Sequence, residues 1–195
     1  MMALNRQDLW SLEEYAVKRP SFREQVIAHK KNRQIALDPH ATLYFEDAMT
    51  MQYQIQEMLR VERIFNPEEI EEELAAYNPL IPDGSNFKAT FMIEYGDVDE
   101  RKAALARMGG IEETVWVRVG DGEKIFAIAN EDMDRSREDK AAAVHFLRFE
   151  LPASAKANLL EESAVLSMGI DHEALPCEIA VEGASKESLQ ADLAP

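Results

Sequence analysis

The sequence predicts an α+β fold in which N-terminal helices pack with a mostly antiparallel β-sheet. Helix-capping motifs and helical spacing dominate residues 1–80, whereas short strand-like runs separated by turn residues dominate residues 85–195. Hairpin-like connections between these runs favour antiparallel pairing, with the helices on one side of the sheet. We therefore expect a single α+β domain over residues 1–195.

The first third of the chain is predicted to be helical, with one small hairpin. Ser11 and Glu14 form a capping box that opens a helix, and Pro20 should end it. Residues 21–32 can then form a second helix. Two short strand-like runs follow around an Asp-Pro-His turn, at residues 33–37 and 42–46.

The next two segments are predicted to be helices. Residues 47–65 show both strand-like alternation and a helical stripe, and their many helix-forming residues favour a helix. Asn66 is placed to cap the following helix, with Pro67 at its first position and Glu69 completing a capping box. The stiff, proline-containing loop 78–84 is the best internal boundary.

Beyond that loop the pattern changes to strands. The predicted strands are 87–95, 114–119, 124–129, 142–151, 164–170 and 178–181. The predicted helices between and after them are 97–108, 152–162 and 186–193. A Gly-Asp-Gly turn should join 114–119 and 124–129 into a hairpin, and the mixed charges of residues 130–140 indicate a solvated loop or lid.

Composition restricts the class of protein. The 195 residues are 46% hydrophobic, which is enough for one domain with a substantial core. No apolar run reaches the roughly 18–20 residues of a membrane span, and residues 1–10 lack the features of a secretory signal. A net charge of −16 disfavours nucleic acid and anionic membranes as partners. The single cysteine excludes an internal disulfide, so we expect a cytoplasmic protein.

One local cluster is basic despite the overall charge. Its residues are Arg23, His29, Lys30, Lys31 and Arg33. We interpret it as a solvated helix end, where cations are favoured near the negative pole of the helix. The alternative is a site for an anion or an acidic partner.

The sequence contains no recognisable catalytic motif, and no cofactor is identifiable from it. The segment Gly120–Gly122 lacks the third glycine of a dinucleotide fingerprint, and the chain has neither a phosphate-binding loop nor a nucleophile elbow. A single chain with one cysteine cannot supply a four-cysteine zinc or iron–sulfur site. Cys177 is interpreted as a small core residue rather than a nucleophile.

Charged residues in apolar segments are the candidate ligand-binding residues. Alternation along residues 142–151 places His145 with Leu147 on one face and Arg148 on the other. A buried guanidinium needs a carboxylate partner or a ligand anion. We expect Glu57 to be the partner of Arg148, so that removing Arg148 costs about 3–5 kcal/mol. The open alternatives are a structural ion pair for Arg148, a satisfied core histidine for His145, and a surface pair between Glu57 and Arg60.

Two histidines are candidates for metal ligands, although no metal can be assigned. His145 is the one in the apolar strand. His172 stands between Asp171 and Glu173 at a strand end, where the carboxylates would raise its pKa and could bind a metal with it. The alternative for His172 is ordinary loop chemistry.

Three stretches together resemble a bacterial family known as domain of unknown function 3501, at residues 45–46 with 54–62, at 77–84 and at 144–149. Residues 11–15 and 169–172 agree with it. The resemblance covers nearly the whole chain but implies no activity. It does imply a redox or peroxide-defence setting by gene association, with a rubrerythrin-like or iron–sulfur protein as partner. The run from His172 to Leu175 departs from the family pattern, which weakens a ligand role for His172.

Two hypotheses remain from the sequence. The first is a non-enzymatic accessory protein that binds a redox partner through its acidic surface. The second is a small-molecule or metal site lined by Glu57, Arg60, His145 and Arg148.

Overall fold

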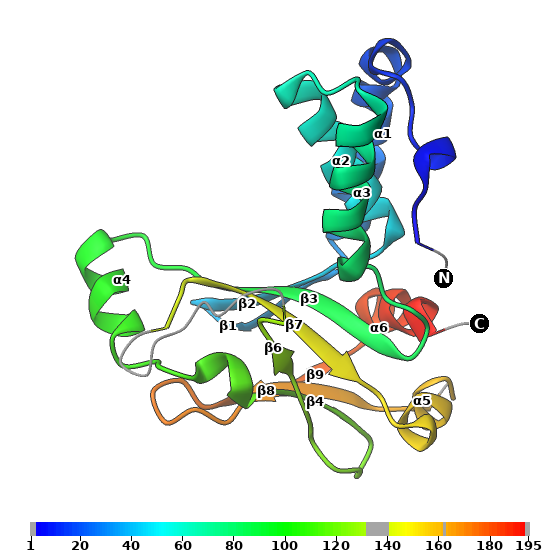
Figure 1. Cartoon of the computed structure of the whole chain (residues 1–195). Coiled ribbons are helices and arrows are strands. Elements are labelled where there is room, and N and C mark those ends of the chain that lie inside the picture. Colours follow the sequence, from blue (N-terminus) through cyan, green and yellow to red (C-terminus); the bar gives the residue numbers. More distant parts are fainter. Residues whose placement is uncertain (1–2, 132–140, 162, 194–195) are drawn as a thin grey trace.

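Two antiparallel sheets face each other across the main core, and three long helices stand on the far side of one sheet (Figure 1). The computed structural model describes residues 3–131, 141–161 and 163–193. The larger sheet has the strand order β1-β2-β3-β7-β6 and the smaller one β5-β4-β8-β9. The α+β class is confirmed. The expected single sheet with helices on one side is wrong, because a second sheet covers the inner face of the first.

Local capping signals define the N-terminal helical module. Its helices are α1 (Leu12–Lys30), α2 (Ala48–Glu62) and α3 (Pro67–Tyr77), preceded by the 3₁₀ turn η1 (Arg6–Asp8). Ser11 and Glu14 form the predicted capping box of α1, and Asn66 caps α3 as expected. Asp47 and Thr50 form a further box at the start of α2.

Pro20 lies inside α1 and does not end it, so the predicted break between two helices is wrong. A proline inside a helix removes one backbone hydrogen bond. Here tertiary packing offsets that loss, because Tyr15, Phe22 and Val26 form a buried cluster of their own. Trp10, Met49 and Tyr53 pack against this cluster and attach α1 to α2.

The larger sheet is built mainly from long-range pairs. Its strands are β1 (Gln34–Asp38), β2 (Ala41–Phe45), β3 (Asn86–Ile93), β6 (Ile128–Ala129) and β7 (Val144–Glu150). Along β7 the residues alternate between buried and half-buried, as predicted. Lys88 of β3 is the register partner of Arg148 of β7. Both side chains therefore project from the outer face of the sheet, towards the helical module.

The smaller sheet contains β4 (Val115–Val119), β5 (Ile125–Phe126), β8 (Leu166–Ile170) and β9 (Cys177–Val181). The predicted hairpin of 114–119 with 124–129 is only half right. Ile125 and Phe126 pair with β4, but Ile128 and Ala129 cross to the other sheet and pair with β7. One short segment therefore connects the two layers.

Short helices and turns complete the fold. They are η2 (Asn78–Leu80), α4 (Val98–Leu105), η3 (Ile111–Thr114), α5 (Ala153–Leu159), α6 (Gly183–Gln190) and η4 (Ala191–Leu193). Most of the predicted loop 130–140 lies outside the described residues. None of the helices in the described part of the chain combines the length and apolar character needed to cross a membrane.

Candidate ligand-binding cleft

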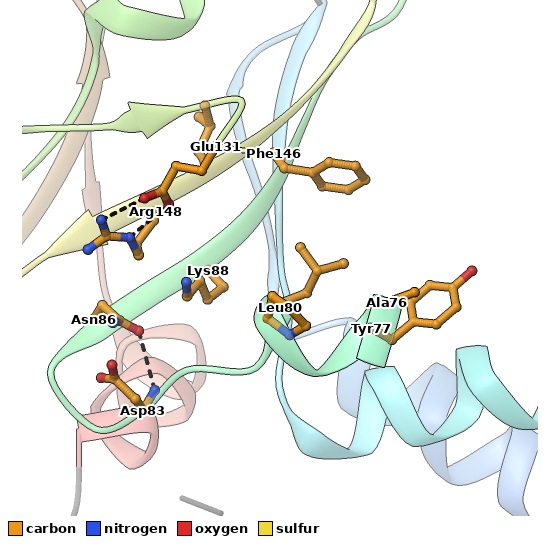
Figure 2. Close-up of a pocket in the computed structure, with 11 residues that line it drawn as sticks. Ala76, Tyr77, Leu80, Asp83, Asn86, Lys88, Glu131, Phe146 and Arg148 are labelled. Carbon is orange, nitrogen blue, oxygen red and sulfur yellow. Dashed lines mark hydrogen bonds and ion pairs between the residues drawn. The ribbon is translucent and has the colours of Figure 1, made fainter. Parts of the chain in front are cut away.

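A cleft of about 760 Å³ lies between the end of α3 and the outer face of the larger sheet (Figure 2). Its apolar wall comes from the helix end, the following turn and β7: Ala76, Tyr77, Pro79, Leu80, Phe146 and Leu147. Its polar floor consists of Asp83, Asn86, Lys88, Glu131 and Arg148. An apolar pocket of this size with a few convergent polar groups is typical of a small-molecule site.

Local sequence signals explain how residues 77–88 form one side of the cleft. Asn78 caps the end of α3, and Pro79 in the next turn cannot continue the helix. The chain then enters β3, where strand alternation buries Phe87 and Ala89 and turns Lys88 outwards. The 77–84 segment of the family resemblance therefore forms one rim of the cleft.

Arg148 is held on the cleft floor by two carboxylates. Its Nε and Nη2 donate to Glu131 at 2.9 and 2.8 Å, and its Nη1 donates to Glu150 at 2.6 Å. These hydrogen bonds lower the pKa of Glu131. The guanidinium charge is thus neutralised by groups of the protein itself.

Lys88 differs from Arg148 because no described residue pairs with it directly. Within the described residues, its amine makes no hydrogen bond or ion pair that would offset its half-buried position. Burial lowers the pKa of Lys88, and the positive charge of Arg148 lowers it further. An acceptor oxygen on a ligand would supply the missing contact.

The rim beside Lys88 is ordered by its own hydrogen bonds. The Ser85 hydroxyl and backbone amide donate to Asp83, which lowers the pKa of that carboxyl. The Asp83 amide in turn donates to Asn86 Oδ1 at 3.3 Å, and Asn86 Nδ2 donates to Glu150. Asp83 is therefore engaged by the loop and does not pair directly with Lys88.

Of the four predicted ligand-binding residues, only Arg148 lines this cleft. Glu57 lies in the helical module, where it accepts hydrogen bonds from Tyr15 at 2.6 Å and Arg19 at 2.7 and 3.0 Å. The predicted contact between Glu57 and Arg148 is therefore wrong. The local alternative is confirmed, since Arg60 Nη2 lies 3.0 Å from Glu57.

The two candidate histidines lie apart from the cleft. His145 is 0% exposed on the inner face of β7, where its Nε2 lies 2.9 Å from the Ala142 carbonyl. His172 contacts the Gly109 carbonyl and accepts from the Ala174 amide, which agrees with its interpretation as a loop residue. Among the described residues, no group of three His, Cys, Asp or Glu side chains is placed to hold a metal.

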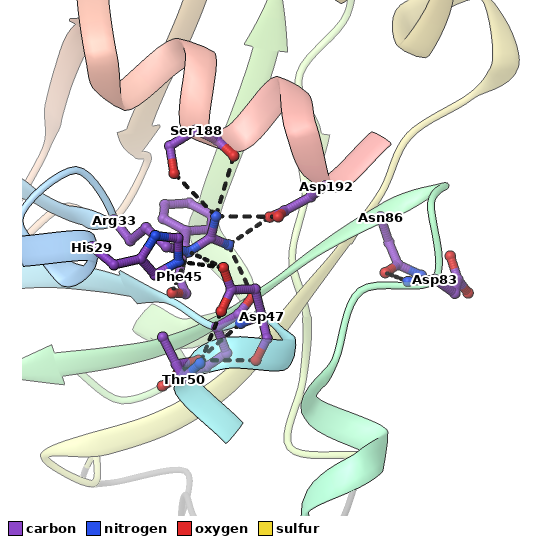
Figure 3. A network of polar contacts seen from close by, with 10 residues as sticks. His29, Arg33, Phe45, Asp47, Thr50, Asp83, Asn86, Ser188 and Asp192 are labelled. Carbon is purple, nitrogen blue, oxygen red and sulfur yellow. Dashed lines mark hydrogen bonds and ion pairs between the residues drawn. The ribbon is translucent and has the colours of Figure 1, made fainter. Parts of the chain in front are cut away.

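The basic cluster contains a buried ion pair that sequence reasoning missed. Arg33 is only 2% exposed and forms a bidentate pair with Asp192, at 2.6 and 3.1 Å (Figure 3). Its Nε also donates to the Phe45 carbonyl, and His29 contacts Asp47 beside it at 2.5 Å. Interpreting Arg33 as part of a solvated helix end is therefore wrong.

Burial raises the pKa of Asp192 to about 6, although the Arg33 contact opposes that shift. A signal for this burial exists in the sequence. Arg33 shares the alternating face of Ile35 and Leu37, which are both buried. The alternation thus begins at Arg33, which the predicted strand 33–37 includes, one residue before the observed strand β1.

The fold and the cleft define a two-sheet α+β protein with an N-terminal helical module. The chain belongs to the family DUF3501, described as a protein of unknown function, whose model matches residues 3–193. It is similar to a protein of unknown function from Burkholderia pseudomallei K96243 with a known crystal structure. The two share 47% identity with a TM-score of 0.92, over 99% of this chain and all of that chain. No curated protein matches.

Proposed function

We propose that the cleft between α3 and the larger sheet binds a small, partly apolar carboxylate. The half-buried Lys88 amine carries this proposal, because it is the cation in the cleft that the described residues leave without a direct partner. Arg148 is already neutralised by Glu131 and Glu150. A ligand carboxylate is therefore expected to contact Lys88 rather than Arg148.

The shape and lining of the cleft support the rest of the ligand. Tyr77, Leu80 and Phe146 line it, so it can bury an apolar group while the carboxylate contacts Lys88 (Figure 2). The ion pair would form in a partly desolvated place, where it is stronger than in water. Ligand binding should consequently raise the pKa of Lys88 towards its ordinary value.

Titration with phenylacetate, followed by NMR of the full chain, tests this proposal. Resonances of Tyr77 and Phe146 should shift with phenylacetate and much less with the neutral isostere phenylacetamide. The Lys88→Met variant should lose this difference, whereas Lys102→Met, which removes an exposed lysine of α4, should keep it. Equal shifts from acid and amide, or an unaffected Lys88→Met variant, would contradict the proposal.

As a second function we propose an accessory role in which the acidic surface of α3 docks a basic partner, with a rubrerythrin-like or iron–sulfur protein as the candidate that the family resemblance implies. This surface consists of the exposed Glu68, Glu69, Glu71 and Glu72. Burial and the neighbouring carboxylates raise the pKa of the adjacent Glu73, which indicates uncompensated negative charge. A basic partner would relieve this repulsion.

Association kinetics with a purified rubrerythrin-like protein test this second function. Surface charges are screened over about 8–10 Å at physiological salt, so added salt should slow association more than it speeds dissociation. Replacing Glu68, Glu71 and Glu72 by Gln should likewise slow association more than it speeds dissociation. Neutralising Lys30 and Lys31 should leave binding intact. Absence of association at low salt, or a rate insensitive to salt, would count against docking through α3.

A further inference from the structure

We infer that Glu112, Asn130 and His145 form a binding site for one divalent transition-metal ion of the Zn²⁺ type. The site lies on the inner face of the larger sheet, whereas the cleft lies on the outer face. Glu112 comes from η3, Asn130 follows β6, and His145 belongs to β7. Three chain segments far apart in sequence thus bring one imidazole, one carboxylate and one amide together.

The spacing of the three polar atoms fits a metal ion. Asn130 Nδ2 lies 3.3 Å from His145 Nδ1 and 3.4 Å from Glu112 Oε1, and the latter two atoms are 3.8 Å apart. A point equidistant from all three lies about 2.0 Å from each. Zn²⁺ bonds to imidazole nitrogen and carboxylate oxygen are roughly 2.0–2.2 Å long.

Two buried oxygens also indicate that a cation belongs here. Glu112 Oε2 and Asn130 Oδ1 are both buried and have no hydrogen-bond partner in the described part of the chain. A buried acceptor without a partner is destabilising, and more so when it is charged. Glu112 is only 4% exposed, and a cation bound at Oε1 would compensate the charge that the carboxylate shares between Oε1 and the unpartnered Oε2.

The histidine is oriented as a metal ligand would be. Its Nε2 faces the Ala142 carbonyl, which can only accept a hydrogen bond, so Nε2 carries the proton. In the neutral ring, Nδ1 is then the basic nitrogen, and it faces Asn130 and Glu112. Histidines that bind metals commonly donate their other ring N–H to a backbone carbonyl, which fixes the tautomer in this way.

Asn130 completes the set through its amide oxygen. Rotation of the amide by half a turn exchanges Oδ1 with Nδ2 and places the oxygen at the corner of the triangle. Asn130 has a left-handed backbone, with φ of 53°, which asparagine tolerates better than most residues. The Asn130 side chain lies beside His145. The next residue, Glu131, lines the cleft on the other face of the sheet.

Zn²⁺ titration of the tag-free, chelator-treated chain tests the site. The wild-type protein should bind one Zn²⁺ per chain. Changing a group that only hydrogen-bonds to a metal ligand already weakens metal affinity about 10–100-fold, so Glu112→Gln should weaken it by at least about tenfold. Glu113→Gln, which alters the exposed neighbour on the same turn, and His172→Gln should both bind as wild type does.

A measurement on the unmodified chain keeps the test independent of whether the variants fold. Long-range ¹H–¹⁵N NMR of the histidine rings distinguishes the two nitrogens of each imidazole. Zn²⁺ should shift Nδ1 of His145 and leave its Nε2 protonated. No Zn²⁺ binding by wild type, ligation through Nε2, or equal loss of affinity in Glu112→Gln and Glu113→Gln would each overturn the inference.

Discussion

Replacing Arg33 by Met should destabilise the protein more than disrupting any other ion pair between described residues. The substitution keeps a long side chain but leaves Asp192, which is 2% exposed, as a buried carboxylate without its cation. Breaking a buried pair from one side costs about 3–5 kcal/mol. For a domain of this size that corresponds to a fall in Tm of roughly 6–20 °C.

Urea unfolding of four chains measures this effect: wild type, Arg33→Met, Asp192→Leu and the double variant. If the loss comes from an unpaired buried charge, the double variant should be more stable than Arg33→Met alone. Arg148→Met is the matched control, because its side chain is 23% exposed and its partners are 50% and 43% exposed.

The control should lose only about 1 kcal/mol, since exposed pairs contribute little. This revises the sequence-based expectation of a 3–5 kcal/mol loss at Arg148, because the structure shows that its pairs are partly hydrated. Equal losses in Arg33→Met and Arg148→Met would refute the reasoning from burial.

Three further predictions concern pH, the cleft and packing. Hydrogen bonds, first from Arg19, lower the pKa of Glu57 from 4.5 to about 2, so its contribution to stability is present above about pH 4.5 and lost as pH falls towards 2. The wild-type unfolding free energy should therefore fall more steeply over this interval than that of Glu57→Gln. Arg148→Met should raise the pKa of Lys88 without restoring it to its ordinary value, because burial is the larger cause of its lowering. NMR of the ¹³C-dimethylated chain measures this pKa, and a lower or unchanged pKa in the variant would contradict the prediction. Gly169→Ala should lower Tm, since its Cβ would lie 2.3 Å from a backbone carbonyl and 2.5 Å from the Trp116 ring; an unchanged melting curve would contradict this clash.

Elements with local causes could be predicted from the sequence. The cap at Asn66 and the capping box at Ser11 depend on residues within one turn, so their spacing is visible in the chain. The alternation of β7 is equally local, and it placed His145 and Arg148 on opposite faces correctly.

Features decided by distant segments could not be predicted in this way. Arg148 takes a carboxylate two residues away and another on the neighbouring segment, while Glu57 is engaged by Arg19 of another helix. Nothing in the periodicity of β7 selects among the many acidic residues of this chain. Distant partners also explain why the second sheet was not predicted. Residues 124–129 divide between two partner strands that lie in opposite layers.

The cleft was missed for a related reason. Lys88 occupies an ordinary outward position of an alternating strand, which by itself predicts a solvated lysine. Its environment is set by the end of α3 and by Phe146, neither of which is close to it in sequence. Of the four predicted residues, Arg148 alone belongs to the cleft, and the others belong to two separate clusters.

The pair between Arg33 and Asp192 also sets an order of events during synthesis. The two residues are 159 positions apart, and ribosomes add about 5–20 residues per second. A nascent chain therefore carries Arg33 without its partner for roughly 8–30 seconds. The helical module and the first hairpin can form in that interval, but the junction between them closes only after η4 has emerged. Folding intermediates on the ribosome should thus keep this arginine hydrated, and the native contact is among the last to form.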